Sequence, residues 1–198
     1  MSVYEFQAES VFLPKNYLIN DGNGIYPMSN KLLDVIHREF DGMFSHYSKL
    51  LVVRLDFHLG IEEGNNNSMS VMIKKLRKKL GSKYSMGKFG YVWVREKEKS
   101  KSHHYHLMLI LNGHKIRHPS FLISWIEKRW LSLGYPKPYT PKHCFYFILR
   151  YEQQKMAECL YRVSYLAKKR GKGYTDKYTR NYSSSRIKNL INNQRKIK

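Results

Sequence analysis

Two histidines separated by one tyrosine, His104-Tyr105-His106, begin a run of apolar residues, Leu107–Leu111, that is typical of a buried strand. Side chains alternate between the two faces of a strand, so both imidazoles are expected on one face and close together. Imidazole is a common ligand for divalent metals, and the pair therefore predicts a metal site. A packing or surface role is the alternative, because a His-x-His motif alone does not exclude it.

A carboxylate on the neighbouring strand could complete the ligand set. The segment Phe89–Glu96 is strand-like, and the polar Lys97–Ser102 separates it from His104, which predicts a hairpin. With the turn in the middle of that polar segment, Glu96 lies opposite His104, and cross-strand partners share a face. Two imidazoles and one carboxylate leave open positions on Mn²⁺ or Mg²⁺, as a catalytic ion requires. A register slip of two residues would bring in Glu98 instead.

An acidic residue also interrupts the apolar strand expected over Leu50–Leu59. Asp56 and His58 share one face of this strand, and Arg54 stands beside them. We expect this strand to lie next to the one that carries the histidines. Asp56 is therefore a candidate for fixing an imidazole tautomer or for a further ligand. A purely structural partner for its carboxylate is an equal alternative.

A possible nucleophile lies on a helix expected over Gln153–Lys169. Tyr161, Tyr165 and Lys168 fall on one stripe of that helix. A phenolic oxygen, with a free pKa near 10, can attack phosphorus if the helix packs beside the metal site. Lys168 would then add positive charge at the transition state or favour the phenolate. Ordinary core packing of the tyrosines is the alternative.

The charge of the chain points to a polyanionic partner. Lysine and arginine total 36 against 15 acidic residues, a net charge of +21, and such an excess destabilises a compact protein by self-repulsion. The basic residues are spread from Lys74–Lys79 to Lys168–Lys177, which favours an extended nucleic-acid track. A ribosome-like or merely soluble basic protein is the alternative. The candidate nucleic-acid contacts are Arg54, Lys169, Arg170, Arg180 and Arg186.

The remaining features favour a soluble, cytoplasmic protein without a membrane partner. Cys144 and Cys159 have neither metal-type nor disulfide spacing, and reduced thiols are expected. The first ten residues lack the charged and apolar regions of a signal peptide. No apolar run approaches the roughly 20 residues that span a membrane.

The order of the expected elements predicts an α+β fold. Residues 1–26 are expected to be irregular, and a helix over 29–47 follows, capped by Ser29 or Asn30. Strand, helix, strand, strand, helix and strand come next, followed by the helix that carries the tyrosines. This is the ferredoxin-like, split βαβ order, an antiparallel sheet of about four to five strands with helices on one face. The six middle elements are expected over Leu50–Leu59, Ser68–Leu80, Phe89–Glu96, His104–Leu111, Pro119–Leu133 and Cys144–Arg150.

Three regions are expected on this basis. Residues 1–48 form an N-terminal lead and helix, residues 49–170 form the core with the candidate site, and residues 171–198 form a basic C-terminal segment.

The motifs in this order resemble the HUH endonucleases, named for His-hydrophobe-His. The resemblance is to rolling-circle replication initiators, in particular the YagK/YfjJ and filamentous-phage gene II-type replication proteins. It covers roughly residues 50–186. The matching pieces are the hairpin ending in His104-Tyr105-His106, Asn112-Gly113-His114, Tyr161 to Lys168, and Thr179–Arg186.

The resemblance implies a function and its residues. His104 and His106 would hold the divalent ion, with Glu96 as the best candidate for an acidic third ligand. Tyr165 would cut single-stranded origin DNA by forming a 5′-phosphotyrosine bond, which frees a 3′-hydroxyl for priming. Tyr161 matches the second tyrosine of two-tyrosine members. A Walker-type motif is absent from the sequence, so helicase and polymerase are expected from the host.

Alternative functions remain open, one of them from another class of protein. A single-tyrosine transposase of the same fold would carry the same residues. A mobilisation relaxase is less expected, since those enzymes commonly place the tyrosine before the histidines. A non-catalytic, single-stranded nucleic-acid-binding module is the alternative from another class, because exposed aromatic residues on such sheets stack on bases.

Overall fold

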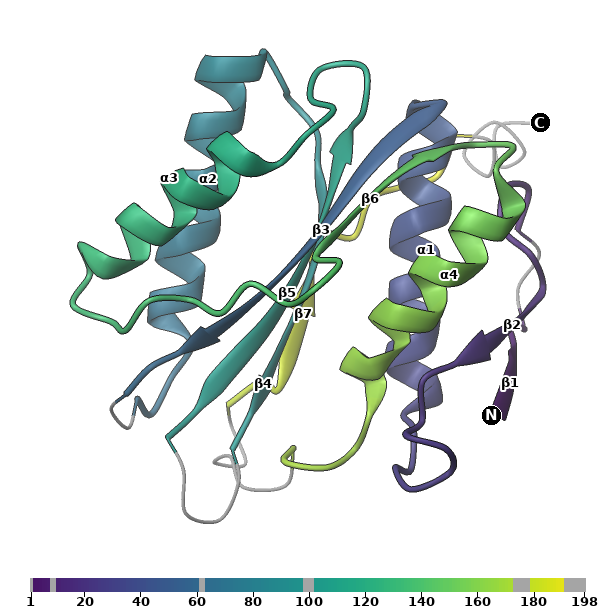
Figure 1. Ribbon diagram of the computed structural model, residues 1–198, viewed down its shortest axis with the longest axis horizontal. Coiled ribbons are helices and arrows are strands. Elements are labelled where there is room, and N and C mark those ends of the chain that lie inside the picture. The colour runs from purple at the N-terminus through teal and green to yellow at the C-terminus, as the bar shows by residue number, and fades with distance from the viewer. Residues whose placement is uncertain (1, 8–9, 61–62, 98–101, 173–178, 191–198) are drawn as a thin grey trace.

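A five-stranded antiparallel sheet forms the centre of the computed structural model (Figure 1). The structure describes residues 2–7, 10–60, 63–97, 102–172 and 179–190. The strand order is β6-β3-β5-β4-β7, so β3 and β5 are central. The strands are β3 (Lys49–His58), β4 (Gly90–Glu96), β5 (His104–Asn112), β6 (Phe145–Leu149) and β7 (Tyr182–Ser184).

The ferredoxin-like arrangement is confirmed. The chain runs β3-α2-β4-β5-α3-β6, and these four strands lie in the sheet in the order β6-β3-β5-β4. The helices α2 (Asn67–Tyr84) and α3 (Ser120–Leu131) make the two crossover connections that this order requires. β3 pairs with β5 along its whole length, as the position of the histidine strand predicts. The fifth strand, β7, adds an edge beyond β4.

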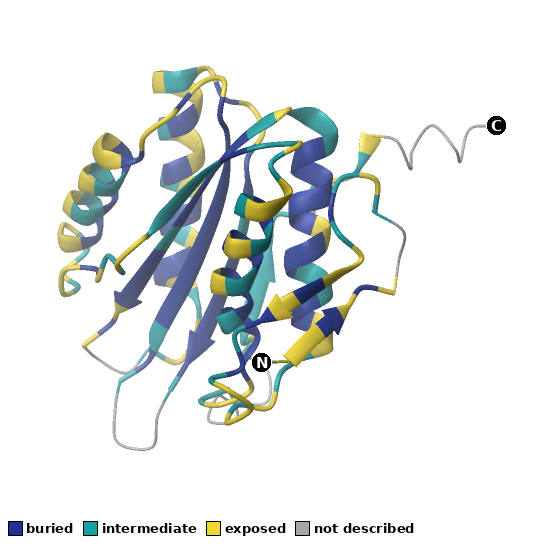
Figure 2. Cartoon of the chain, turned by 45° about the vertical axis from the view of Figure 1, so that its right-hand side comes forward, coloured by how far each residue is buried: buried dark blue, intermediate teal, exposed yellow. Residues whose placement is uncertain are grey.

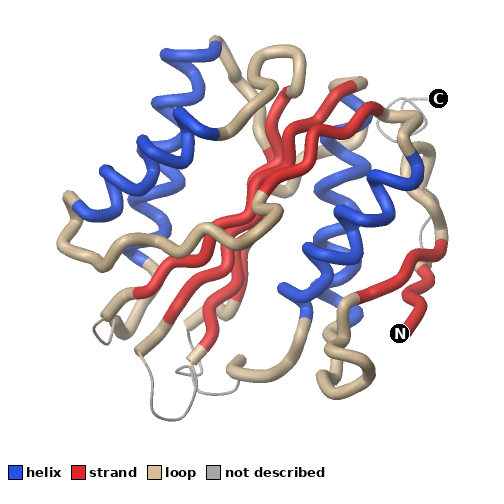
Figure 3. Tube along the Cα trace, viewed as in Figure 1, coloured by secondary structure: helices blue, strands red, loops and turns tan. Residues whose placement is uncertain are grey.

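Helices cover both faces of the sheet, which corrects the expectation of helices on one face. The crossing helices α2 and α3 share one face, whereas α1 (Asn30–His46) and α4 (Gln153–Ser164) lie on the other (Figures 1 and 3). The central strands require this cover because they are apolar on both sides. In β3, Leu50 faces the α1/α4 core and Leu51 faces the α2/α3 core. Figure 2 shows the central strands buried between the two helical layers.

A short two-stranded sheet replaces the irregular lead predicted for residues 1–26. β1 (Ser2–Glu5) pairs with β2 (Asn16–Ile19) in antiparallel register. In β2, Tyr17 and Ile19 are buried and alternate with exposed residues, so the strand covers α4 with one face only. The N-terminal strands therefore share the core of α1 and α4.

The helix boundaries test the capping predictions. Ser29 caps α1, and its Oγ accepts a hydrogen bond from the Leu32 backbone N–H at 3.4 Å, as predicted. The helix α2 extends beyond the predicted range Ser68–Leu80 at both ends. It starts at Asn67, one residue before Ser68, and continues through Gly81 to a left-handed Ser85.

Two further expectations concern the whole chain. Both cysteines are free thiols, Cys144 half-buried and Cys159 buried. In the described part of the chain, every helix is either too short or too polar to cross a bilayer.

Truncating the core between α1 and the sheet tests this packing. Phe40 of α1 is fully buried, and Phe40→Ala is expected to reduce the free energy of unfolding by about 3–5 kcal/mol, through lost burial and the cavity left behind. Phe121 of α3 is 44 % exposed, so Phe121→Ala should cost less than about 1 kcal/mol. Urea denaturation of both variants provides the comparison. Equal losses would contradict the assigned core.

Candidate active site

The pairing of β4 with β5 brings the predicted metal ligands together. Glu96 lies directly opposite His104, and Asp56 of β3 lies directly opposite His106. The predicted register is confirmed, and Glu98 lies outside the described residues. These side chains share the α1/α4 face with Val94, two residues before Glu96 on the same strand.

Three potential ligands form a compact cluster at this end of the sheet. The Nε2 atoms of His104 and His106 lie 3.6 Å and 3.4 Å from Glu96 Oε2. All three ligand atoms lie within 4.8 Å of one another. Glu96 and His106 are buried, and His104 is half-buried. The cluster can hold a metal ion.

Asp56 orients His106 for this role. The His106 Nδ1 lies 2.7 Å from Asp56 Oδ1, and Asp56 is held in turn by the Arg54 guanidinium at 3.2 Å. With Nδ1–H donating to the carboxylate, Nε2 keeps its lone pair toward Glu96. That Nε2 is buried and has no hydrogen-bond partner in the described structure. A buried nitrogen without a partner is costly, and a bound ion would remove that cost.

The neighbours of the cluster shift the pKa values of its members. Burial raises the pKa of Glu96, but the neighbouring imidazoles of His104 and His106 and the charge of Lys172 lower it by more, leaving it well below its usual range. Burial lowers the pKa of His106, but the adjacent carboxylates of Asp56 and Glu96 raise it by more. Glu96 is therefore ionised, and protons compete with a metal ion for His106.

The predicted helix over Gln153–Lys169 is shorter than expected, and this places Tyr165. α4 ends at Ser164, and a 3₁₀ turn, η1 (Tyr165–Ala167), follows. The reason is a backbone pairing with the start of α1. The Ala167 carbonyl accepts from the Ser29 N–H, and the Lys169 N–H donates to the carbonyl of Pro27, each at 2.8 Å.

Lys168 connects Tyr165 to the cluster. Its buried Nζ donates to the Tyr165 hydroxyl at 2.9 Å and lies 3.2 Å from Glu96 Oε2. Arg54 lies over the Tyr165 ring at 5.5 Å from the centroid. The structure thus brings together Tyr165, Lys168 and the three potential ligands, which are far apart in the sequence.

Two residues at the site were missed from the sequence. Lys172 Nζ donates to Glu96 Oε1 at 3.0 Å, so both carboxylate oxygens face an ammonium group. The Tyr26 ring packs edge-to-face on Tyr165 with centroids 6.1 Å apart. Lys172 belongs to a basic run that carries no periodic pattern, and Tyr26 lies in a segment expected to be irregular, so neither had a sequence signal.

Tyr161 is placed elsewhere. It lines a surface depression of about 520 Å³ together with Leu18 of β2 and Tyr146 of β6. In the described structure its side chain has no hydrogen bond or ring contact with the cluster. Tyr165 is therefore the tyrosine that the fold brings to the candidate metal centre.

The predicted nucleic-acid contacts separate into three groups. Arg54 is held within the site by Asp56. Lys169 and Arg170 are exposed just after η1, where Arg170 donates to the Tyr26 hydroxyl at 3.4 Å. Arg180 and Arg186 are exposed on either side of β7 and line a groove.

Residues 10–185 match the family model of the YagK/YfjJ C-terminal domain. The chain belongs to this family. The match to the YagK/YfjJ C-terminal domain includes the three potential ligands, Tyr165 and β7, so the whole candidate site lies within the matched residues. No match was found among curated proteins or solved structures.

The pH dependence of metal binding tests whether His106 is a ligand in this YagK/YfjJ domain. The pKa of His106 lies above the 6.5 of free imidazole. Below that pKa a bound ion must displace a proton, so Mn²⁺ affinity should fall by up to about tenfold per pH unit. Calorimetric titration between about pH 6 and pH 8 measures this. His106→Ala should abolish binding, whereas His114→Ala, at an exposed histidine, should retain it. A pH-independent affinity would contradict the assignment.

Replacing Asp56 tests its role behind His106. Asp56→Asn keeps the size of the side chain but loses the charge that holds Nδ1–H, and Mn²⁺ affinity should fall by about 10–100-fold. Glu127→Gln on α3, which loses a carboxylate that pairs with Lys137 on the far side of the sheet from His106, is the matched control. Unchanged affinity in a folded Asp56→Asn protein would show that Asp56 does not orient the ligand.

Proposed function

We propose that this protein is a metal-dependent endonuclease and strand transferase of the HUH type, which cuts single-stranded DNA to start rolling-circle replication. The observation that carries the proposal is the connection of a tyrosine hydroxyl to a three-ligand cluster through one buried lysine. Tyr165, Lys168 and Glu96 are linked by contacts of 2.9 Å and 3.2 Å. Nucleophile, cation and ligands within one contact chain suit attack on a phosphodiester.

The proposed reaction exchanges one phosphoester for another. The Tyr165 oxygen attacks the scissile phosphorus, its proton passes to water, and the bond from phosphorus to the 3′ oxygen breaks. The 3′ oxygen takes up a proton and becomes the priming 3′-hydroxyl. The 5′ phosphate remains on Tyr165, which conserves the bond energy for a later rejoining step.

The neighbouring cations support attack by the phenolic oxygen. The Lys168 ammonium donates to the Tyr165 hydroxyl, so it places positive charge beside the attacking oxygen. Lys172 pairs with the other oxygen of Glu96 and adds positive charge near the phosphate. A Mn²⁺ or Mg²⁺ ion held by Glu96, His104 and His106 would supply a Lewis acid for a phosphate oxygen.

The position of Tyr161 favours a single nucleophile. Because Tyr161 lies with Leu18 and Tyr146, we propose that Tyr165 alone forms the covalent bond. A single-tyrosine transposase would use the same residues. It would differ in its DNA substrate, because it cuts hairpin ends and not a replication origin. In a replication initiator, helicase and polymerase would come from the host.

A covalent adduct assay tests the proposal. Labelled single-stranded DNA from the genetic neighbourhood of the protein is incubated with it, with and without Mn²⁺, and resolved on denaturing gels. A metal-dependent adduct is expected, and Tyr165→Phe and His106→Ala should each lose it, because one removes the nucleophile and the other a ligand.

Two tyrosine variants provide the controls. Tyr151→Phe, at a side chain that is 77 % exposed, and Tyr161→Phe should both retain the adduct. Loss of the adduct in Tyr161→Phe would instead support a reaction that uses both tyrosines. If no adduct forms, and neither Tyr165→Phe nor His106→Ala changes the retention of DNA, the protein is a non-catalytic binding module. Its affinity for DNA should then depend mainly on salt concentration.

A further inference from the structure

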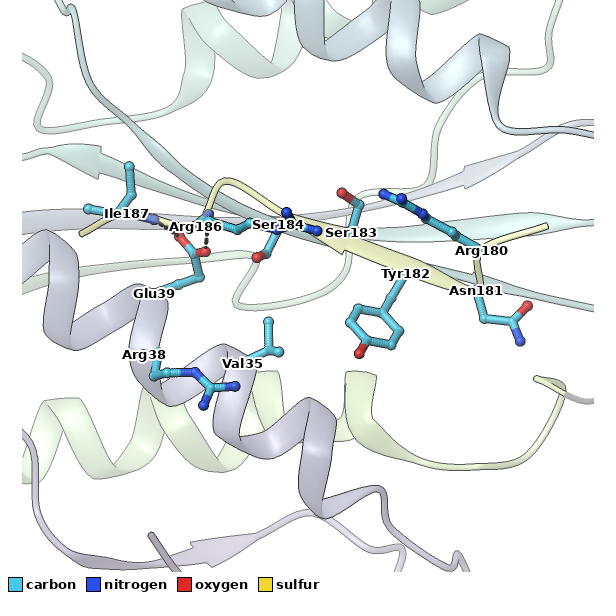
Figure 4. Close-up of a pocket in the computed structure, with 10 residues that line it drawn as sticks. All are labelled: Val35, Arg38, Glu39, Arg180, Asn181, Tyr182, Ser183, Ser184, Arg186 and Ile187. Carbon is cyan, nitrogen blue, oxygen red and sulfur yellow. Dashed lines mark hydrogen bonds between the residues drawn. The ribbon is translucent and has the colours of Figure 1, made fainter. Parts of the chain in front are cut away.

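A groove between α1 and the edge strand β7 takes no part in the chemistry proposed above (Figure 4). Its volume is about 640 Å³, within the range of roughly 300–1,000 Å³ found for small-molecule sites. One wall is the segment from Arg180 to Ile187, and the other comes from Val35, Arg38 and Glu39 of α1. β4 pairs with the inner side of β7.

The groove is strongly cationic. Arg38, Arg180 and Arg186 are exposed, and their guanidinium groups have no hydrogen bond or ion pair within the described structure. In Figure 4, Arg180 and Arg186 stand at the two ends of the β7 wall, with Tyr182 between them. Three free guanidinium groups along one groove suit a ligand with several phosphates.

The acidic residue in the lining does not offset this charge. Among the described lining residues Glu39 is the sole acid, and it is buried. Its carboxylate accepts hydrogen bonds from the Ser185 hydroxyl and from the backbone N–H groups of Arg186 and Ile187. These bonds hold Arg186 in a left-handed conformation, φ 55°. Glu39 thereby fixes the end of the groove at which Arg186 stands.

The other end of the groove leads to the candidate active site. The Asn181 side chain donates to the Lys172 carbonyl at 2.8 Å, and Lys172 Nζ lies 3.0 Å from Glu96. The Asn181 carbonyl also accepts from the Arg95 N–H, next to Glu96. A strand cut at Tyr165 could therefore continue past Lys172 into the groove.

We propose that this groove binds the single-stranded DNA flanking the scissile phosphate, an inference that rests on the proposed function. Arg38, Arg180 and Arg186 contact successive phosphates, and Tyr182 offers a ring on which a base stacks. Cations beside an aromatic ring are the usual composition of single-strand tracks. Arg38 is a contact that the sequence did not indicate.

A binding measurement without cleavage tests the groove separately from the chemistry. In a Tyr165→Phe background with EDTA, fluorescence anisotropy of a labelled single-stranded oligonucleotide gives affinity at several salt concentrations. Each phosphate contact in a single strand contributes about 0.7 to the slope of log K against log salt. Arg38→Ala combined with Arg186→Ala should therefore lower the slope by about 1.4 and weaken binding at least tenfold.

The control removes the same charge elsewhere. Arg117→Ala combined with Lys128→Ala, both exposed and outside the groove, should leave the slope within about 0.3 of the parent. Tyr182→Leu, which keeps apolar volume but removes the ring, should weaken binding at least fivefold at unchanged slope. Tyr182→Phe should bind as the parent does.

The outcomes separate the groove from the proposed function. If the groove variants and the controls give the same slope and affinity, the inference is overturned, even when the Tyr165 adduct forms. If the groove variants lose affinity as expected while no adduct forms in the wild type, the groove stands and the nicking function fails. A parent protein that binds the duplex as tightly as the single strand would also overturn the inference.

Discussion

The register between β4 and β5 is the constraint on which the candidate site depends. A shift by one residue would turn Glu96 away from His104, since strand side chains alternate with a period of two. Packing forbids that shift, because Trp93 belongs to the α2/α3 core and Val94 to the α1/α4 core. The ligand geometry is therefore a consequence of a sheet whose two faces are both buried.

The position of Tyr165 depends on a different, longer-range constraint. Tyr165 reaches the cluster because the turn after α4 pairs with the chain entering α1, through Ser29 and Pro27. The same N-terminal region supplies Tyr26, which packs on the Tyr165 ring. The potential metal ligands and the tyrosine thus come from two structural units, the hairpin and the α1/α4 layer, and Lys168 is the contact between them.

What the sequence could predict follows from how local each feature is. The hairpin, its register and the Ser29 cap depend on alternation and on neighbouring residues, and they are confirmed. The end of α4 at Ser164 depends on hydrogen bonds to residues far away in the sequence, which no periodicity reveals. The layer on the second face was missed for a related reason, because an apolar run such as Leu107–Leu111 fits a strand covered on one side or on both. Lys172 was missed because a basic residue in a basic run has no distinguishing pattern.

The order of strands in the sheet has a consequence for folding. Of the strand pairs in the described five-stranded sheet, only β4–β5 joins strands that are consecutive in the chain. Every other pair closes a longer loop, which costs more chain entropy and delays its formation. The hairpin that carries Glu96, His104 and His106 is thus the segment of the sheet expected to form earliest. Substitutions there are therefore expected to change the rate of folding as well as the finished site.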